Sequence, residues 1–177
     1  MSHIIAAVST SLAVSAIGII RLTGDGCAQV AEKVFSSINK VTLSNAPDRK
    51  LILGTLQDRS GRVIDQCMAV YSRGPHSYTG EDTVEFHCHG SPAVLTAGLE
   101  ALYAAGALPA KRGEFTKRAF LNGRIDLSQA EAVIDLIRAK TDRGFDVAMD
   151  QMEGSLSREI KAIRAKLMDV LVNITVN

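Results

Sequence analysis

TVEFHCHGSPAVLTAGLEALYAAG, residues 83–106, joins a strand pattern directly to a helix pattern. Side chains alternate in polarity over Thr83–His89, which predicts a strand. Ser91 is a good N-cap and Pro92 suits the first helical position, while Gly106 is a natural C-cap. The stretch therefore predicts a strand followed at once by a helix that ends just before Gly106.

Upstream of this stretch, strand and helix signals are mixed. Short runs of β-branched and apolar residues predict strands, and turn residues separate them. The predicted strands are Ile4–Val8, Ile17–Leu22, Lys50–Leu56 and Val63–Tyr71, with the last two in a hairpin, and Cys27–Ile38 is a predicted helix. Gly74–Asp82 is a predicted loop. This mixed order, with hairpin-like pairs, favours an α+β fold over a strictly alternating α/β fold.

Beyond about Lys111 the chain is charged and strongly helical. Apolar residues recur every three or four positions from Leu127 to Met152, which predicts one long helix, and Ser128 begins a capping-box pattern. A second apolar stripe after Gly154 predicts another helix, so the two would pair as a helical hairpin about that glycine. Because the final residues are still apolar, we expect a helical region that continues past residue 177.

Composition excludes several classes of protein. Hydrophobic residues make up 46% of the chain and the net charge is +1, so composition indicates neither nucleic-acid binding nor membrane binding. The three cysteines are odd in number and widely spaced, which fits a reducing compartment better than a disulfide framework. We expect the apolar stretch of residues 3–20 to form two short strands rather than a secretion signal or a membrane span, because no Lys or Arg precedes it and serines interrupt it.

Glu85, His87 and His89 would share one face of the predicted strand. Two histidines at this spacing can bind a metal, but Cys88 points to the other face and zinc needs three or four protein ligands. A polar strand end with hydrogen-bonded histidines is the alternative. Glu85 by itself could accept two parallel hydrogen bonds from an amidine-like N–H pair, as in a pterin or guanine, or it could pair with an arginine. Both interpretations of Glu85 stay open.

Arg21 and the segment Gly113–Leu127 (GEFTKRAFLNGRIDL) are the other candidates. Arg21 stands in an apolar strand, so its charge must reach solvent, a carboxylate such as Glu85, or a ligand anion. The segment mixes charged and apolar residues at the junction between the two parts of the chain. That mixture indicates packing that positions polar groups, or else a charged, solvated helix.

Familiar catalytic motifs are absent from the sequence. There is no P-loop G-x-x-x-x-G-K-[ST] to bind a nucleotide phosphate, and no G-x-S-x-G, H-E-x-x-H or C-x-x-C. No spacing supports a catalytic triad or a nucleophile–base pair. We therefore predict no catalytic residue and no metal ligand in these 177 residues.

Three ordered motifs resemble the tRNA-modification GTPase family called MnmE or TrmE, over essentially the whole chain. The motifs are Gly18–Gly24 (GIIRLTG), Gly74–Asp82 (GPHSYTGED) with Glu85 and His89-Gly90 downstream, and Gly113–Leu127 running into Ser128–Ala132. The resemblance implies an N-terminal α+β domain over residues 1–118, with a mixed-sheet fold similar to folate-binding one-carbon enzymes of the aminomethyltransferase type. Residues 119–177 would be the first helices of a helical domain. The GTPase domain and the C-terminal Cys-x-Gly-Lys tail of the family would lie outside this chain.

The resemblance also implies a cofactor of the 5-formyltetrahydrofolate type. By alignment of the motifs, Arg21, Glu85 and Arg124 fall on folate-contacting positions, where Glu85 would bind the pterin edge and the arginines would face anionic or carbonyl groups. Arg124 stands where many members have Lys, which keeps the charge and changes the geometry. The first loop, Thr10–Ala16, lacks the Gly-rich stretch common in the family, so backbone approach to the ligand differs there.

The partners implied by the resemblance are a second copy, bound through the N-terminal domain, an FAD-containing MnmG-type protein, and tRNAs modified at carbon 5 of the wobble uridine. GTP, Mg²⁺ and K⁺ would act only in the GTPase domain. The implied location is cytoplasmic, with no membrane contact. We expect a folate-binding, dimerising N-terminal portion. The alternatives are a pure assembly module without a ligand and a free-standing folate-dependent one-carbon transferase.

Overall fold

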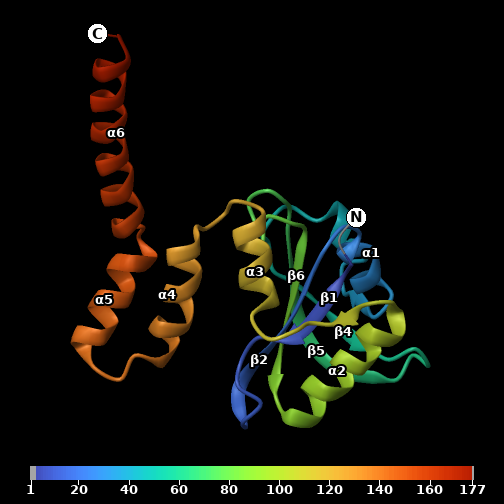
Figure 1. Ribbon diagram of the computed structural model, residues 1–177. Coiled ribbons are helices and arrows are strands. Elements are labelled where there is room, and N and C mark those ends of the chain that lie inside the picture. Colours follow the sequence, from blue (N-terminus) through green and yellow to red (C-terminus); the bar gives the residue numbers. More distant parts are fainter. Residues whose placement is uncertain (1–2, 177) are drawn as a thin grey trace. The chain divides into compact units, whose positions relative to one another are not determined.

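The computed structural model describes residues 3–176, and the chain divides into two compact units, Met1–Arg118 and Ala119–Asn177. The first unit is built on one seven-stranded sheet with the order β3-β4-β5-β6-β2-β1-β7 (Figure 1). Neighbouring strands are antiparallel except β1 and β7, so the sheet is mixed. The strands are β1 Ile5–Val8, β2 Ser15–Thr23, β3 Phe35–Ser37, β4 Ile52–Gln57, β5 Val63–Ser72, β6 Thr83–Gly90 and β7 Leu108–Pro109. The predicted α+β class, a mixed sheet followed by helices, is confirmed.

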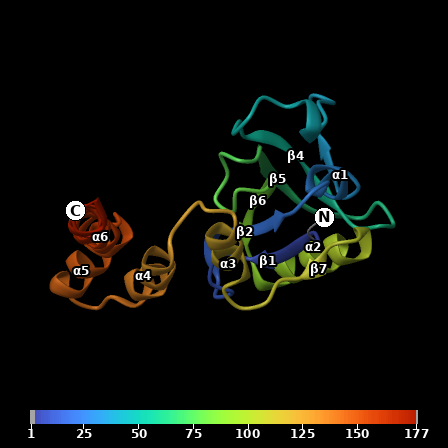
Figure 2. The ribbon, with the colours of Figure 1, turned by 45° about the horizontal axis from the view of Figure 1, so that its top comes forward.

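Helices α1 (Cys27–Glu32) and α2 (Pro92–Ala105) cover one face of the sheet (Figure 2). The residues that point to this face from the central strands are mostly buried, and most residues on the opposite face are exposed or half-buried. The packed face includes Ile20, Leu22, Leu56, Val84 and Phe86. We call the opposite side the open face; it carries Arg21, Leu53, Met68, Glu85 and His87.

Two glycines let α2 lie close against the sheet. A Cβ atom at Gly18 of β2 would sit 2.7 Å from Leu95, and one at Gly98 of α2 would sit 2.6 Å from Ile20. Both distances are shorter than carbon atoms tolerate, so helix and strand touch where side chains are missing. As predicted, α2 begins after Ser91 and ends at Gly106, which has φ 117°.

The predicted helix Cys27–Ile38 is wrong in its second half. Helix α1 ends at Glu32, and Phe35–Ser37 forms the edge strand β3, paired with β4. Phe35 is buried, its ring centroid lies 5.6 Å from that of Phe86, and it occupies the space left free by Gly54. The gain from burying this ring and from the backbone pairing with β4 exceeds the local preference for continuing the helix.

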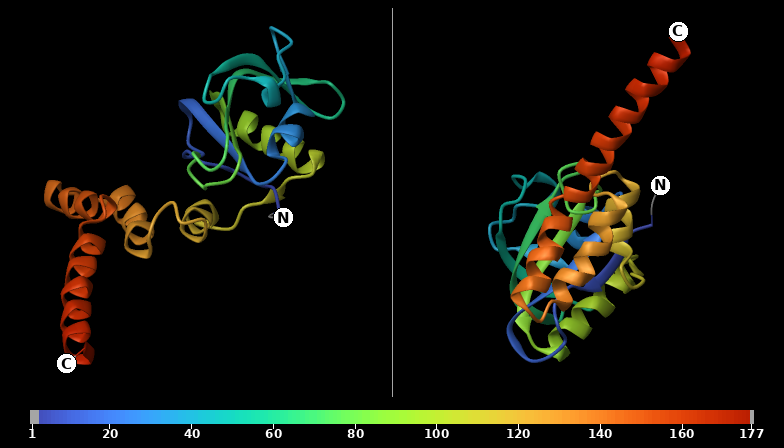
Figure 3. Two further views of the ribbon diagram at one scale, coloured as in Figure 1. Left: turned by 90° about the horizontal axis from the view of Figure 1, so that it is seen from above. Right: turned by 60° about the vertical axis from the view of Figure 1, so that its left-hand side comes forward.

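The second unit consists of α4 (Leu127–Arg138), α5 (Asp142–Met152) and α6 (Ser155–Val176). The prediction of one long helix over 127–152 is therefore wrong. The chain breaks at residues 139–141, where Thr141 starts α5 by accepting a hydrogen bond from the backbone N–H of Gly144. Helices α4 and α5 pack side by side, with Ala132 and Ala148 buried (Figure 3). The hairpin is thus made by this break, and not about Gly154.

The cap of α4 also differs from the prediction. Asp126, not Ser128, is the N-cap: its carboxylate accepts from the backbone N–H of Gln129, and the Gln129 side chain accepts from the backbone N–H of Asp126. Ser128 Oγ is buried and finds no hydrogen-bond partner among residues 3–176. Asp followed by Gln three residues later can form the same kind of capping box as Ser followed by Glu. The spacing alone therefore could not decide whether the helix starts at Asp126 or at Ser128.

Side-chain hydrogen bonds also join the start of α4 to the two helices that follow it. Gln129 Nε2 donates to the Met152 carbonyl at 2.8 Å, and Gln151 Nε2 donates to the Ser128 carbonyl at 3.1 Å. The Ser157 hydroxyl donates to the Asp126 carboxylate. That hydrogen bond, with the backbone N–H of Gln129, lowers the pKa of Asp126.

Replacing Asp126 by Ala should destabilise the second unit by about 1 kcal/mol, because the cap of α4 is lost. The lowered pKa means that this contribution is present above the ordinary Asp pKa and disappears as pH falls through the folded-state value. Thermal unfolding followed by helical circular dichroism at neutral and acid pH measures both effects. Ser128→Ala is the matched control; if it costs as much as Asp126→Ala at neutral pH, the cap is wrongly assigned.

Candidate functional site

The structure brings Arg21 and Glu85 together on the open face. The two residues are directly opposite in the pairing of β2 with β6, and Arg21 Nε donates to Glu85 Oε1 at 2.6 Å. Their side chains are 24% and 23% exposed, so the pair is partly withdrawn from water. The contact accounts for a charge in the middle of an apolar strand. An ion pair between these two residues was one of the alternatives that the sequence suggested for each of them.

Two aromatic rings lie against the guanidinium of Arg21. Its central carbon is 5.2 Å from the ring centroid of Tyr78 and 5.6 Å from that of Phe115. Phe115 is the second residue of α3 (Glu114–Leu121). The hydroxyls of Tyr78 and Thr116 share a hydrogen bond of 2.9 Å. Rings at such distances hold a cation by their negative faces. Sequence reasoning missed both aromatics, although each lies in a segment singled out for other reasons.

The loop between β5 and β6, residues 73–82, is held in place by its own polar groups. Asp82 accepts from the Tyr71 hydroxyl at 2.5 Å and from the Gly74 N–H at 2.9 Å, and the hydroxyls of Thr23 and Thr79 meet at 2.7 Å. Burial is the main cause that raises the pKa of Tyr71, and the hydrogen bond to Asp82 is the second, so the hydroxyl keeps its proton. The Gly74–Pro75 peptide is cis. These bonds position Tyr78 without help from a ligand.

Arg118 joins the same loop to α3. Its guanidinium donates to Glu81 at 2.8 Å and to Glu114 at 3.2 Å, and its side chain is 11% exposed. The backbone N–H of Lys111, more than Arg118, lowers the pKa of Glu114. Between Gly113 and Arg118, the mixed charged and apolar sequence therefore positions polar groups. This agrees with the first of the two alternatives given for the segment, and not with a solvated helix.

The second carboxylate oxygen of Glu85 can still accept a hydrogen bond. Within residues 3–176, Glu85 Oε2 receives no hydrogen bond, and its near neighbour is His87 Nε2 at 3.6 Å. His87 Nε2 is buried and has no hydrogen-bond partner among those residues. Buried polar atoms are nearly always paired, so an unpaired one beside a half-used carboxylate favours a place where a ligand completes the bonding.

Arg124, the third predicted site residue, belongs to the second unit. It follows Gly123, which has φ 68°, and its backbone N–H donates to the Ala119 carbonyl at 2.8 Å. The side chain is exposed and makes no ion pair within the described residues 3–176. Its role in binding stays a prediction.

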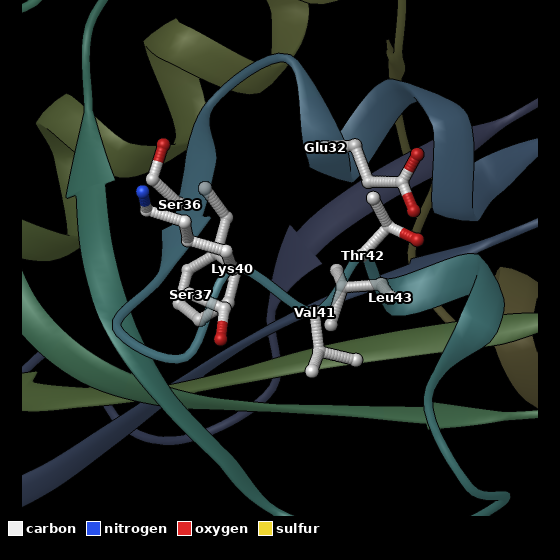
Figure 4. A pocket seen from close by; sticks show the side chains of 8 residues that line it. Glu32, Ser36, Ser37, Lys40, Val41, Thr42 and Leu43 are labelled. Atoms are coloured by element: carbon white, nitrogen blue, oxygen red, sulfur yellow. The ribbon is translucent and has the colours of Figure 1, made fainter.

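A separate hollow of about 250 Å³ lies between β3 and the 3₁₀ turn η1 (Leu43–Asn45). Figure 4 shows Lys40 and Ser36 on one side of it, with Glu32 and Thr42 on the other. Glu32 already accepts from the Ser44 N–H at 2.7 Å. The hollow contains neither Arg21 nor Glu85. Over residues 3–176, no group of three or more His, Cys, Asp or Glu side chains is placed to hold a metal ion.

The sheet domain and the helices each match a known family. Residues 4–124 match the family described as GTP-binding protein TrmE N-terminus, and residues 127–177 match the MnmE helical domain. The chain belongs to the TrmE/MnmE family. The resemblance carried by the three sequence motifs is therefore confirmed.

Curated relatives agree with this assignment. The chain is 47% identical over 175 residues to the tRNA modification GTPase MnmE of Finegoldia magna and 48% identical over 174 residues to that of Geobacillus kaustophilus. Each alignment covers 98% of this chain and 38% of the relative. This TrmE/MnmE chain thus corresponds to the N-terminal region of those proteins. None of the helices in residues 3–176 has the length and apolar character needed to cross a membrane.

Replacing Arg118 by Met should loosen the first turns of α3, because Glu81 and Glu114 lose their shared partner. We expect local protection to fall by about 2 kcal/mol, the usual contribution of hydrogen bonds to charged groups. Hydrogen exchange of the α3 amides measures the change. Lys117→Met is the control, since Lys117 is exposed and adjacent; equal loosening by both variants would contradict a specific role for Arg118.

Proposed function

We propose that this chain is the folate-binding and dimerising region of a tRNA-modification GTPase. The observation that carries the proposal is the Arg21–Glu85 pair enclosed by Tyr78 and Phe115, at positions that the family resemblance assigns to folate. The ligand would be 5-formyltetrahydrofolate or a related tetrahydrofolate. Arg124 would contribute a second positive charge.

The chemistry of the pair suits a pterin. A reduced pterin offers neighbouring N–H donors on one edge, and Glu85 keeps Oε2 free to accept from them while Oε1 stays with Arg21. Tyr78 and Phe115 supply aromatic rings beside Arg21, the partner of that carboxylate. A planar ring with a polar edge therefore finds stacking surface and acceptors in one place.

Other parts of the family's activity belong to the same proposal. Together with an FAD-containing MnmG-type partner, the whole protein would modify carbon 5 of the wobble uridine in certain tRNAs, in the cytoplasm. GTP hydrolysis with Mg²⁺ and K⁺ would occur in a GTPase domain, for which residues 1–177 contain no P-loop. The relatives' name, tRNA modification GTPase, supports this assignment.

Self-association would use the first unit. The loop between β1 and β2 exposes two apolar side chains, Leu12 and Val14, the latter 86% exposed. Thr10 closes this loop by accepting from the Ile19 N–H at 3.1 Å, so the loop is held by its own bonds. An apolar residue so fully exposed on an ordered loop favours contact with another protein surface.

Replacing Glu85 by Gln should weaken binding of 5-formyltetrahydrofolate by about tenfold or more, because a charged acceptor becomes neutral. Calorimetric titration measures affinity, and thermal unfolding shows that the variant is folded. Glu100→Gln, on the exposed side of α2, is the control. Arg124→Ala should also weaken binding, while Arg124→Lys should keep most of it.

Absence of measurable heat with folded wild-type chain would overturn the folate site and favour the pure assembly module. Turnover of a folate substrate by this chain alone would instead favour the one-carbon transferase. Unchanged affinity in Glu85→Gln would remove Glu85 from the site while leaving folate binding in place.

Replacing Val14 by Lys should shift the chain from dimer to monomer, because a charge would be desolvated at the contact. Sedimentation velocity over a range of concentrations measures the change. Ile38→Lys is the matched control, since Ile38 is also an exposed apolar residue, 53% accessible, outside the β1–β2 loop. A dimer that survives Val14→Lys and dissociates with Ile38→Lys would place the interface elsewhere.

A further inference from the structure

A second polar pair, Asp65 with His89, lies where β5 and β6 stop pairing. The two strands pair from Ser72 and Thr83 as far as Met68 and His87. Beyond that point β5 continues with β4 and β6 continues with β2. Asp65 fills the gap: its Oδ2 accepts the backbone N–H of His89 at 2.8 Å, and its Oδ1 lies 2.7 Å from Nδ1 of the same residue.

The pair fixes which ring nitrogen of His89 is offered outward. Asp65 is buried, 8% exposed, and a carboxylate accepts hydrogen bonds, so Nδ1 is the nitrogen that donates. The imidazole itself is 73% exposed, and within residues 3–176 its Nε2 has no hydrogen-bond partner. A buried carboxylate behind an exposed imidazole holds the ring in one orientation and one tautomer, the arrangement that positions histidines for binding and proton exchange.

The surroundings of His89 form a hollow of about 390 Å³ on the open face. Its lining is mainly apolar, and the side chains that matter are Ile17, Leu53, Gln66, Met68, His87 and His89. Gln66 of β5 and His89 of β6 both line this hollow. Gln66 is exposed, so its amide can donate beside the acceptor Nε2. A flat apolar floor with one acceptor and one adjacent donor matches the edge of a ring amide, an N–H next to a C=O.

We propose that His89, oriented by Asp65, anchors a binding site for a planar heterocycle that carries a ring amide. Nε2 accepts the ring N–H, Gln66 donates to the neighbouring carbonyl, and the ring lies over Leu53 and Met68. Four residues of strand separate His89 from Glu85, about 13 Å, so one ring does not reach both. The site is therefore a second subsite on the same face.

Two molecules implied by the proposed function carry such a ring amide: the uracil of the modified nucleotide, and the pterin of a folate molecule other than the one at Glu85. This inference rests on that function for its choice of probes. The probes are 5-formyltetrahydrofolate and uridine 5′-monophosphate, each titrated separately into this chain with ¹⁵N-labelled histidine. The ¹⁵N shifts report the tautomer of His89 before addition and contact with Nε2 after it.

The free chain should show His89 protonated at Nδ1, and at least one probe should shift its Nε2 resonance. His89→Gln should weaken binding of that probe by about tenfold, the loss of one good hydrogen bond. His76→Gln is the control, because His76 is exposed on the 73–82 loop and outside the hollow. Asp65→Asn, which loosens the ring without removing it, should weaken binding in the same direction.

Three results would overturn the proposal: a proton on Nε2 and not on Nδ1 in the free chain, no shift of His89 with either probe, or equal affinity in His89→Gln and wild type. Failure of Asp65→Asn to fold leaves the first two tests intact. Folate binding that falls in Glu85→Gln but not in His89→Gln, with no uridine effect, keeps the proposed function and rejects this subsite. A uridine-dependent shift of His89 in a chain that binds no folate keeps this subsite and rejects the proposed folate site.

Discussion

The register of β2 against β6 is the constraint on which the first unit depends. It sets Ile20 opposite Phe86 and Arg21 opposite Glu85. Since successive side chains point to opposite faces, the same register sends the apolar pair under α2 and the charged pair to the open face. A slip of β2 by one residue would turn over the side chains of that strand, so that Arg21 would be buried against the helix and Ile20 would be exposed. Core packing and charge placement therefore specify one and the same alignment.

Much of the sheet could be predicted from sequence because its signals are local. Alternation in Thr83–His89, the Ser91-Pro92 start and the Gly106 end each depend on a few neighbouring residues. The errors came where a distant partner decides. Phe35 leaves the helix pattern because Gly54 and Phe86 make room for its ring, and residues 139–141 break a continuous stripe because α5 folds back on α4. Neither partner is visible within a helix-length window.

In the candidate site too, local features could be predicted from sequence and contacts with distant residues could not. A charge inside an apolar strand is conspicuous in sequence, so Arg21 and its pairing with Glu85 could be anticipated. Tyr78 and Phe115 could not, because their meeting at Arg21 depends on the hydroxyl and carboxylate bonds that shape the loop and on Arg118. Asp65 was missed for a similar reason: it contacts His89 only because two strands diverge.

Close packing behind the sheet also limits which substitutions the open face can accept. A Cβ atom at Gly18 or at Gly98 would lie less than 3 Å from a neighbouring side chain, which would have to move. A side chain at Gly18 would have to displace the methyl groups of Leu95, three residues before Arg21 on the same strand. Mutational tolerance in this domain is thus set partly by residues that no ligand touches. Larger residues at these two glycines would therefore disturb the support behind the open face without touching a ligand.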